Sequence, residues 1–402
     1  MVTVVHGSKI SSADGNYPDN TLVISFTIEN KLWYNQVKHS FVMDICPDPI
    51  AVIGVATKFP GEAETFESLW RFLLRGRSAW KPFPEDRIGP GHYHPDINHR
   101  GTHAVRGGHF LNEDPALFDA PFFNITRSEL AALDPQQRLV LENVYHALEN
   151  AGLALSEITG SDTSVYVSGF NHDHLLNLSG DPETHLKYRA TGTTNSLLSN
   201  RVSWFYNLKG PSMTLDTACS SSMVSLHLAC QALLSGESKL SIVSGVTMIS
   251  YPTDIVGMSN HGFLGPGGKS YSFDHRAEGY GRGEGVGSVV VKRLSDAIRD
   301  GNTIRAIIRA TAVNQDGRTP GISLPSTEAQ VKLIRRVYES AGLDPRDTPM
   351  VEAHGTGTAA GDPIEAAALA RSFPGKTVEV PLIVGSLKSS IGHLEGGAGV
   401  AG

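Results

Sequence analysis

The sequence predicts an α/β protein in which buried, largely parallel strands alternate with helices. Short runs of aliphatic and β-branched residues, such as 50–55, 240–246 and 286–292, are separated by stretches of helical length and periodicity. Glycine or proline stands at many of the junctions, and the chain contains 42 glycines. With 402 residues, the chain has room for one large α/β unit or two ordinary domains.

The first half of the chain carries clear helix-start signals. Thr126 precedes Glu129 by three residues, as in a capping box, and Asp134 followed by Pro135 is typical of a helix N-terminus. The expected strands are 50–55, 163–169 and 240–246, and the expected helices are 62–77 and 136–150. Residues 197–206 are expected to pass from a helix toward a strand as the chain approaches Cys219.

The second half continues the alternation. Ser326 begins a helix that Gly342 ends, and Asp362 with Pro363 begins another. Strands are expected at 286–292, 304–313, 349–353 and 380–386. The glycine-rich segment 273–285 is not a dinucleotide-binding fingerprint, because its spacing differs and it precedes a strand rather than opening a helix.

Composition excludes several classes of function. The net charge of -7 and the absence of a basic run argue against nucleic-acid binding, and no apolar run approaches the roughly 20 residues that cross a bilayer. Three scattered cysteines, Cys46, Cys219 and Cys230, form no disulfide framework, so we expect a reducing compartment, the cytoplasm. No metal site is expected in the histidine-rich stretch 92–109, because no cysteine joins it and no zinc-type spacing occurs.

One stretch has the pattern of an activated nucleophile. Met213 and Leu215 alternate with polar residues as in a short strand, and an apolar helix-length run at 223–234 ends at Gly236. Cys219 then lies at the start of a buried helix, where free N–H groups and the helix dipole favour a thiolate. The alternative interpretation is a small buried cysteine at a strand–helix junction.

Two further segments each place a histidine among glycines after a strand-like run. Val351-Glu352-Ala353-His354-Gly355-Thr356-Gly357-Thr358 contains His354, and Gly385-Ser386-Leu387-Lys388-Ser389-Ser390-Ile391-Gly392-His393 ends in His393. Glycines beside a histidine remove packing and allow a ligand to approach closely. One cysteine together with two such histidines indicates nucleophilic catalysis, although each histidine alone could be structural.

These three segments, with Asp216-Thr217-Ala218-Cys219-Ser220-Ser221-Ser222 as the first, resemble the signatures of β-ketoacyl synthases. The resemblance is to ketosynthase domains of polyketide synthases, above all the fungal iterative, highly reducing type I enzymes, and runs from about residue 49 to 402. It implies a thiolase-like αβαβα fold of two similar halves. Residues 48–294 would be the half with the nucleophile, and 295–402 an incomplete half with both histidines. Residues 1–47 are unlike the family and are expected to be a disordered leader.

The resemblance also implies a mechanism. Cys219 would take an acyl group from the phosphopantetheine of an acyl carrier protein. A malonyl-type extender would then lose CO₂ while neutral His354 and His393 donate hydrogen bonds to its enolate, in a decarboxylative Claisen condensation. Lys388 and Glu365 would support His393, or would form a plain structural ion pair. Phe263, Thr356 and Thr358 are the expected substrate-binding residues. The domain would bind no cofactor and no metal, and would be a homodimer.

Two departures from the family pattern leave alternatives open. Ser390 stands where the family usually has Asn, and the chain stops at Gly402, whereas the family continues with further strands and a Gly-Phe-Gly-type loop that completes the oxyanion hole. A truncated, inactive ketosynthase acting as a dimerisation scaffold is therefore one alternative. A stand-alone condensing or thiolase-like acyltransferase that uses coenzyme A thioesters is another.

Overall fold

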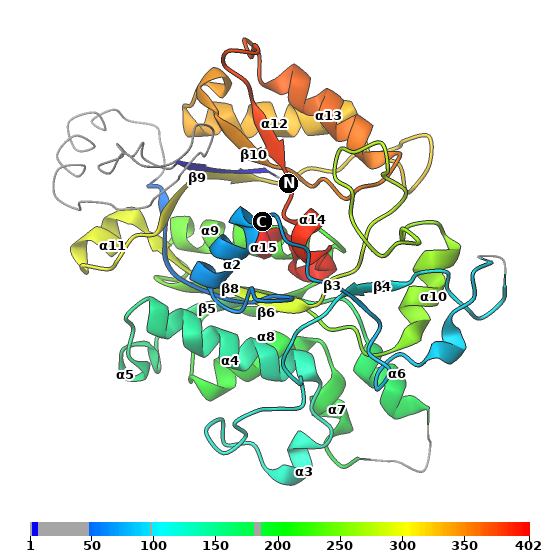
Figure 1. Ribbon diagram of the computed structural model, residues 1–402. Coiled ribbons are helices and arrows are strands. Elements are labelled where there is room, and N and C mark those ends of the chain that lie inside the picture. Colours follow the sequence, from blue (N-terminus) through cyan, green and yellow to red (C-terminus); the bar gives the residue numbers. More distant parts are fainter. Residues whose placement is uncertain (1, 7–47, 97–98, 181–185) are drawn as a thin grey trace.

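Helices and strands alternate in five layers in the computed structural model, which describes residues 2–6, 48–96, 99–180 and 186–402 (Figure 1). Helices α4 (Pro135–Asn150) and α8 (Ser196–Phe205) cover one face of the main sheet, and α9 (Ser221–Ser235) lies on its other face. Beyond α9 come further strands and then an outer layer of α12 (Thr327–Ala341) and α13 (Gly361–Ser372). The predicted αβαβα layering is confirmed.

The main sheet has seven strands in the order β1-β9-β2-β8-β7-β5-β6. The strands are β1 (Val2–His6), β2 (Ile50–Lys58), β5 (Ser164–Ser168), β6 (Ser212–Leu215), β7 (Ser241–Thr247), β8 (Gly285–Arg293) and β9 (Ala306–Ala312). The sheet curls, so that β9 lies on the side of α9 opposite to β5 and β7 (Figure 1). This curvature is what surrounds α9 with strands.

The prediction of largely parallel strands is wrong for this sheet. Within its described part, the parallel pairs are β5–β6 and β5–β7, whereas β2 pairs antiparallel with both β8 and β9. The physical reason is visible at β7 and β8, where the last residue of β7, Thr247, pairs with the first residue of β8, Gly285. The connection returns to the end of the sheet that the chain has just left, so β8 must run back along β7.

Helix α9 is the central element of the core. It begins directly after the Cys219 turn and ends at Gly236, whose φ of 78° is the left-handed C-cap conformation that glycine adopts without strain. Leu226, Ala229 and Leu233 are buried against residues of β2, β5 and β7. A second cluster on the other face of the sheet packs α4 and α8 against the same strands. The helix that follows Cys219 is therefore enclosed on nearly every side, as its sequence predicts.

Two predicted helix starts are confirmed, whereas the helix predicted at 62–77 is shorter and covers Phe66–Leu74. Asp134 caps α4 by accepting a hydrogen bond from Gln136 N at 2.8 Å, and Ser326 caps α12 by accepting one from Ala329 N at 3.2 Å. The other helical elements are α2 (Phe66–Leu74), α3 (Arg127–Leu130), α5 (Leu155–Ile158), α6 (Asp173–Ser179), α7 (Arg189–Thr193), α10 (Pro252–Asn260), α11 (Leu294–Arg299), α14 (Lys388–Ile391) and α15 (Ala398–Ala401), with 3₁₀ turns at Pro90–His92, Pro345–Asp347 and Glu395–Gly397. None of the described helices is long and apolar enough to cross a bilayer.

Two small sheets complete the architecture. β3 (Trp80–Pro82) pairs antiparallel with β4 (Gly107–His109), and β10 (Met350–Glu352) pairs parallel with β11 (Ile383–Gly385). The side chains of Met350 and Ile383 are 47% and 45% exposed, so the β10–β11 pair presents apolar surface to solvent.

The predicted leader is only partly described. Val2–His6 forms β1 and pairs antiparallel with β9 at the edge of the main sheet. Residues 7–47, including Cys46, lie outside the described residues, and the prediction of disorder for 1–47 stays a prediction there.

Candidate active site

Cys219 lies in a tight turn between β6 and α9. Ala218 has a φ of 53°, a left-handed conformation that costs energy for any residue but glycine. The turn is held by Asp216, whose carboxylate accepts a hydrogen bond from Ala218 N at 3.0 Å, and by Thr217 N, which donates to Ser221 Oγ at 2.8 Å. Strain at the residue before the thiol, held by hydrogen bonds on both sides, is typical of a nucleophile presented at the start of a helix.

The resting thiol is more basic than the sequence predicts. Burial raises the pKa of Cys219 to about 11, the carboxylate of Glu395 acts in the same direction, and the ammonium of Lys388 opposes it. This shift is opposite in direction to the expected helix-stabilised thiolate, because desolvation of the partly exposed Cys219 outweighs the opposing charge of Lys388. A pKa of about 11 favours the protonated thiol at neutral pH.

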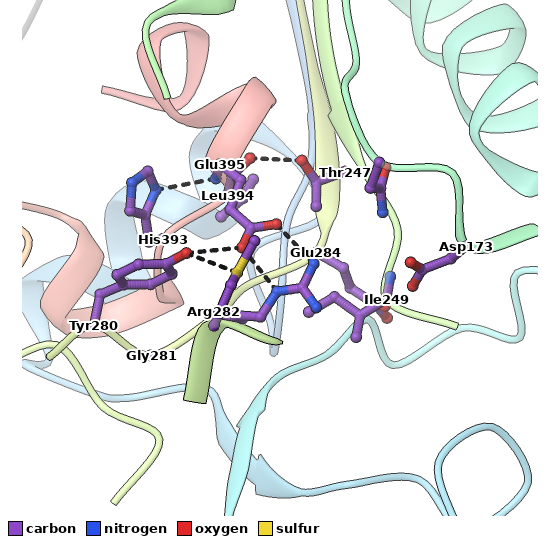
Figure 2. A network of polar contacts seen from close by, with 12 residues as sticks. Asp173, Thr247, Ile249, Tyr280, Gly281, Arg282, Glu284, His393, Leu394 and Glu395 are labelled. Atoms are coloured by element: carbon purple, nitrogen blue, oxygen red, sulfur yellow. Dashed lines mark hydrogen bonds and ion pairs between the residues drawn. The ribbon is translucent and has the colours of Figure 1, made fainter. Parts of the chain in front are cut away.

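His393 is fully buried, and its peptide group is clamped on both sides. His393 N donates to Gly281 O at 2.8 Å, and Gly283 N donates to His393 O at 2.9 Å. The ring atom Nδ1 accepts a hydrogen bond from Glu395 N at 3.0 Å (Figure 2). Since Nδ1 is an acceptor, the ring proton of the neutral imidazole is on Nε2, and Nε2 has no hydrogen-bond partner among the described residues.

His354 lies beside His393, with the ring centroids 5.5 Å apart and the rings edge to face. Its side chain is open to solvent on one side. Glu365 holds the His354 loop by accepting His354 N at 2.7 Å and Gly355 N at 2.8 Å. Desolvation, then the nearby charge of Lys388, lowers the pKa of the fully buried His393 well below its usual value, and the pKa of His354 is lowered in the same way although the residue keeps an exposed surface. Both imidazoles are therefore neutral at physiological pH.

Lys388 is buried at the start of α14, and its supporting role differs from the prediction. No ion pair joins Lys388 to Glu365 within the described part of the chain. Burial lowers the pKa of Lys388, and the carboxylates of Glu352, Glu365 and Asp362 act against this effect. Glu365 holds the backbone of the His354 loop instead of orienting His393, because its two oxygens are occupied by those N–H groups.

The expected substrate-binding residues are tied into the local framework. Thr356 Oγ1 lies 3.0 Å from Thr358 Oγ1, which in turn accepts Gly361 N at the start of α13. Phe263 is 43% exposed after α10, and its carbonyl accepts Tyr280 N at 2.9 Å. Ser390 is connected through its backbone, since its carbonyl accepts Ala79 N at 2.8 Å. Substrate binding by Thr356, Thr358 and Phe263 stays a prediction.

Several residues at the site were missed by sequence reasoning. Asp362 was predicted only as a helix start, yet it accepts Phe273 N at 2.7 Å and Gly357 N at 3.1 Å, and so joins the His354 loop to the glycine-rich segment. Arg282 and Glu395 form a buried ion pair next to His393 (Figure 2). A charged residue two positions after a candidate catalytic histidine was the available signal for Glu395.

His109, the last residue of the histidine-rich stretch, lies beside the site, with its Nδ1 3.2 Å from Arg282 O. His94 and His99 stack on one another with centroids 4.1 Å apart, and His103 is buried between aromatic rings. Among the described residues, no group of three or more His, Cys, Asp or Glu side chains is arranged to hold a metal ion.

Comparison with known proteins shows the family to which this chain belongs. The N-terminal domain of β-ketoacyl synthases matches residues 47–297, and the C-terminal domain of β-ketoacyl synthases matches residues 305–402. The chain belongs to the β-ketoacyl synthase family. It is 52% identical over 356 residues to a 6-hydroxymellein synthase of Talaromyces verruculosus and 51% identical to a lovastatin diketide synthase of Aspergillus terreus, in each case over 88% of this chain and 14% of the relative.

Solved ketosynthases have the same fold. The oxazolomycin ketosynthase domain of Streptomyces albus superposes with a TM-score of 0.83 at 38% identity, over 88% of this chain and 61% of that one. A ketosynthase from module 6 of the bacillaene synthase of Bacillus subtilis gives a TM-score of 0.80 at 37% identity, over 88% and 60% of the two chains. The predicted thiolase-like fold of ketosynthases is confirmed. The ketosynthase therefore spans about a seventh of its curated relatives and about three fifths of these solved chains.

Proposed function

We propose that this chain is the condensing ketosynthase of a fungal-type, highly reducing polyketide synthase, with Cys219 as nucleophile and His354 and His393 as hydrogen-bond donors. The observation that supports this most strongly is the pair of neutral imidazoles whose ring centroids lie 5.5 Å apart, together with a thiol that has the same charged neighbour, Lys388. A neutral imidazole can stabilise a developing oxyanion without offering the proton that a carbanion would capture.

The first half-reaction is acyl transfer. The Cys219 sulfur attacks the carbonyl of an acyl thioester on the phosphopantetheine of an acyl carrier protein, and the C–S bond to the pantetheine breaks. The thiol proton leaves Cys219 as the new C–S bond forms, and the departing pantetheine sulfur ends as a thiol. Because the pKa of Cys219 is about 11, the N–H groups at the start of α9 stabilise sulfur charge only as it develops.

The second half-reaction is decarboxylative condensation. The malonyl C–C bond breaks, CO₂ leaves, and the electron pair forms an enolate whose oxygen accepts hydrogen bonds from His354 and from His393 Nε2. The enolate carbon attacks the acyl carbonyl on Cys219. The Cys219 sulfur leaves and takes up one proton, so the products are a β-ketoacyl thioester on the carrier protein, CO₂ and the free thiol. We therefore class the chain as an acyltransferase of the 3-oxoacyl synthase type.

The proposal includes the partners that this chemistry requires. The substrates are acyl and malonyl thioesters on an acyl carrier protein, and the ketosynthase itself holds no cofactor. A free nucleophilic thiol requires a reducing compartment, for which we propose the cytoplasm. We also propose a homodimer, supported by the edge position of β6 in the main sheet and by the 46% exposure of its Met213.

The intact mass of the protein tests the assignment of the nucleophile. Incubation with a short acyl thioester of pantetheine should add one acyl group to the chain, and Cys219→Ala should remove that adduct. Malonyl carrier protein should then convert the acylated chain to a β-ketoacyl product with release of CO₂. A folded chain that forms no adduct would favour the scaffold role, and faster acylation by coenzyme A thioesters than by carrier-protein thioesters would favour a thiolase-like acyltransferase.

A further inference from the structure

The glycine-rich segment at 279–285 fastens both histidine loops to one another. Gly279 N donates to Gly357 O at 3.0 Å in the His354 loop, and the peptides of Gly281 and Gly283 clamp His393 on its two sides. A Cβ at Gly283 would lie 2.5 Å from Ile391 O, so the approach requires glycine. The segment thus brings the charged side chain of Arg282 next to His393, whereas its other charged residue, Glu284, pairs with Arg87.

Arg282 forms a buried two-pronged ion pair with Glu395. Their side chains are 2% and 0% exposed, and Arg282 Nε and Nη2 each lie 2.8 Å from a different carboxylate oxygen (Figure 2). The Tyr280 hydroxyl donates to the same carboxylate at 3.2 Å. A buried charge pair needs good geometry and full hydrogen bonding, since desolvation of both groups opposes it. Arg282 Nη1 has no hydrogen-bond partner among the described residues, so a gain in stability is a poor explanation for the pair beside His393.

The backbone conformation of Glu395 indicates what the ion pair does. Glu395 has a φ of 45°, a left-handed conformation that a residue other than glycine adopts only when its surroundings enforce it. Arg282 and Tyr280 hold its side chain, and Thr247 Oγ1 fixes the preceding peptide by donating to Leu394 O at 2.7 Å (Figure 2). In this conformation Glu395 N points at His393 Nδ1, 3.0 Å away.

We propose that Arg282 and Glu395 are a positioning pair for His393, which keeps the ring proton on Nε2 and aims it at the reacting thioester. The pair acts through the peptide N–H of Glu395, which occupies Nδ1 and excludes the other tautomer. Tyr280 contacts both members of this arrangement. Its ring packs on His393 with centroids 4.9 Å apart, and its hydroxyl donates to the Glu395 carboxylate. This inference rests on the proposed function and assigns a role in the second half-reaction, where His393 Nε2–H acts.

Glu395→Gln in the full 402-residue chain tests the proposal, with Glu129→Gln as the matched control. Glu395→Gln keeps the shape of the side chain but removes the charge that holds Arg282. Glu129→Gln weakens another largely buried pair, in which Arg201 Nη1 lies 2.6 Å from Glu129. The double variant Arg282→Gln with Glu395→Gln leaves no unpaired buried cation, so it guards against loss of folding. Circular dichroism and acylation of Cys219 report whether each variant is folded.

Two readouts separate positioning from mere stability. Decarboxylation of malonyl-pantetheine should fall about a hundredfold in Glu395→Gln and in the double variant, with Cys219 acylation kept within a few fold, since small displacements of an aligned group have effects of this size. The ¹⁵N resonances of His393, assigned with His393→Gln, should change from a single Nε2–H tautomer to a mixture. Glu129→Gln should change neither.

Retention of decarboxylation and of the Nε2–H tautomer in both variants would overturn the proposal. Equal losses of acylation and decarboxylation would also overturn it, because a structural pair affects both steps alike. If the unaltered chain formed no acyl adduct and released no CO₂, the proposed function would fail. The tautomer of His393 would still report on the pair independently.

Discussion

Gly392→Ala is the substitution whose effect the structure determines most directly. Gly392 precedes His393 with φ 75° and ψ 179°, a region that only glycine occupies without strain. An added Cβ would lie 2.4 Å from His109 Nδ1 and 3.0 Å from Arg282 O. His109 is fully buried, and its ring lies 3.2 Å from that same carbonyl, so neither neighbour is free to move away.

The expected loss of free energy of unfolding in Gly392→Ala has two contributions. The backbone conformation costs an alanine about 1–3 kcal/mol, and overpacking in a filled interior costs about 1–3 kcal/mol more. The free energy of unfolding should therefore fall by about 2–6 kcal/mol. Gly301→Ala is the matched control, because Gly301 also has a positive φ of 69° but an added Cβ there meets nothing within 4 Å. Its cost should be about 1–2 kcal/mol from the backbone alone.

Denaturant unfolding of the unaltered chain, Gly392→Ala and Gly301→Ala measures the difference in free energy of unfolding. Malonyl decarboxylation measures displacement of His393. We expect Gly392→Ala to lose at least about 1 kcal/mol more than Gly301→Ala, and to lose decarboxylation while Gly301→Ala retains it. Equal stability losses for the two variants, with decarboxylation retained in both, would refute the reasoning that His109 and Arg282 enclose this position.

Two further predictions concern protonation. Burial raises the pKa of Asp173 from 3.8 to about 6, so the folded chain holds this proton more tightly than the unfolded chain, and stability falls as pH rises from about 4 to about 6. Above pH 7, the free energy of unfolding of Asp173→Asn should therefore exceed that of the unaltered chain by about 3 kcal/mol. Near pH 4 the two should be equally stable. A difference that does not depend on pH would contradict this. Alkylation of Cys219 by iodoacetamide should accelerate about tenfold per pH unit between pH 7 and 10, because its thiolate fraction does so below a pKa of about 11. A rate already constant above pH 7.5 would show a stabilised thiolate instead.

Sequence reasoning was most successful where local chemistry decides the structure. Ser326, Asp134 and Gly236 are predicted as helix ends from the hydrogen-bonding and conformational properties of single residues, and each performs that role. The strand, turn and buried helix around Cys219 follow from a period change within a few residues, and they too are confirmed. These features depend on neighbours in the chain, which the sequence displays directly.

Features that depend on distant residues were beyond such reasoning. The directions of β8 and β9 relative to β2 depend on which end of the sheet a long connection reaches, and no local pattern encodes that. The pKa of Cys219 depends on burial by residues far along the chain. Arg282 and Glu395 are 113 positions apart, and in the sequence each resembles an ordinary charged surface residue. Only the folded structure shows that the two side chains are buried together, away from water.

After burial, the charge of Lys388 influences the pKa of all three candidate catalytic residues. Its ammonium is the first charged group after burial to lower the pKa of His393 and of His354, and it opposes the rise in the pKa of Cys219. Burial lowers the pKa of Lys388, and the carboxylates of Glu352, Glu365 and Asp362 oppose this effect. Desolvation and this one cation together lower the pKa of both histidines, while the same cation favours negative charge on the sulfur. In the proposed function, acyl transfer needs charge to develop on sulfur and condensation needs donors that keep their protons, so the charge of Lys388 acts in the required direction for both half-reactions.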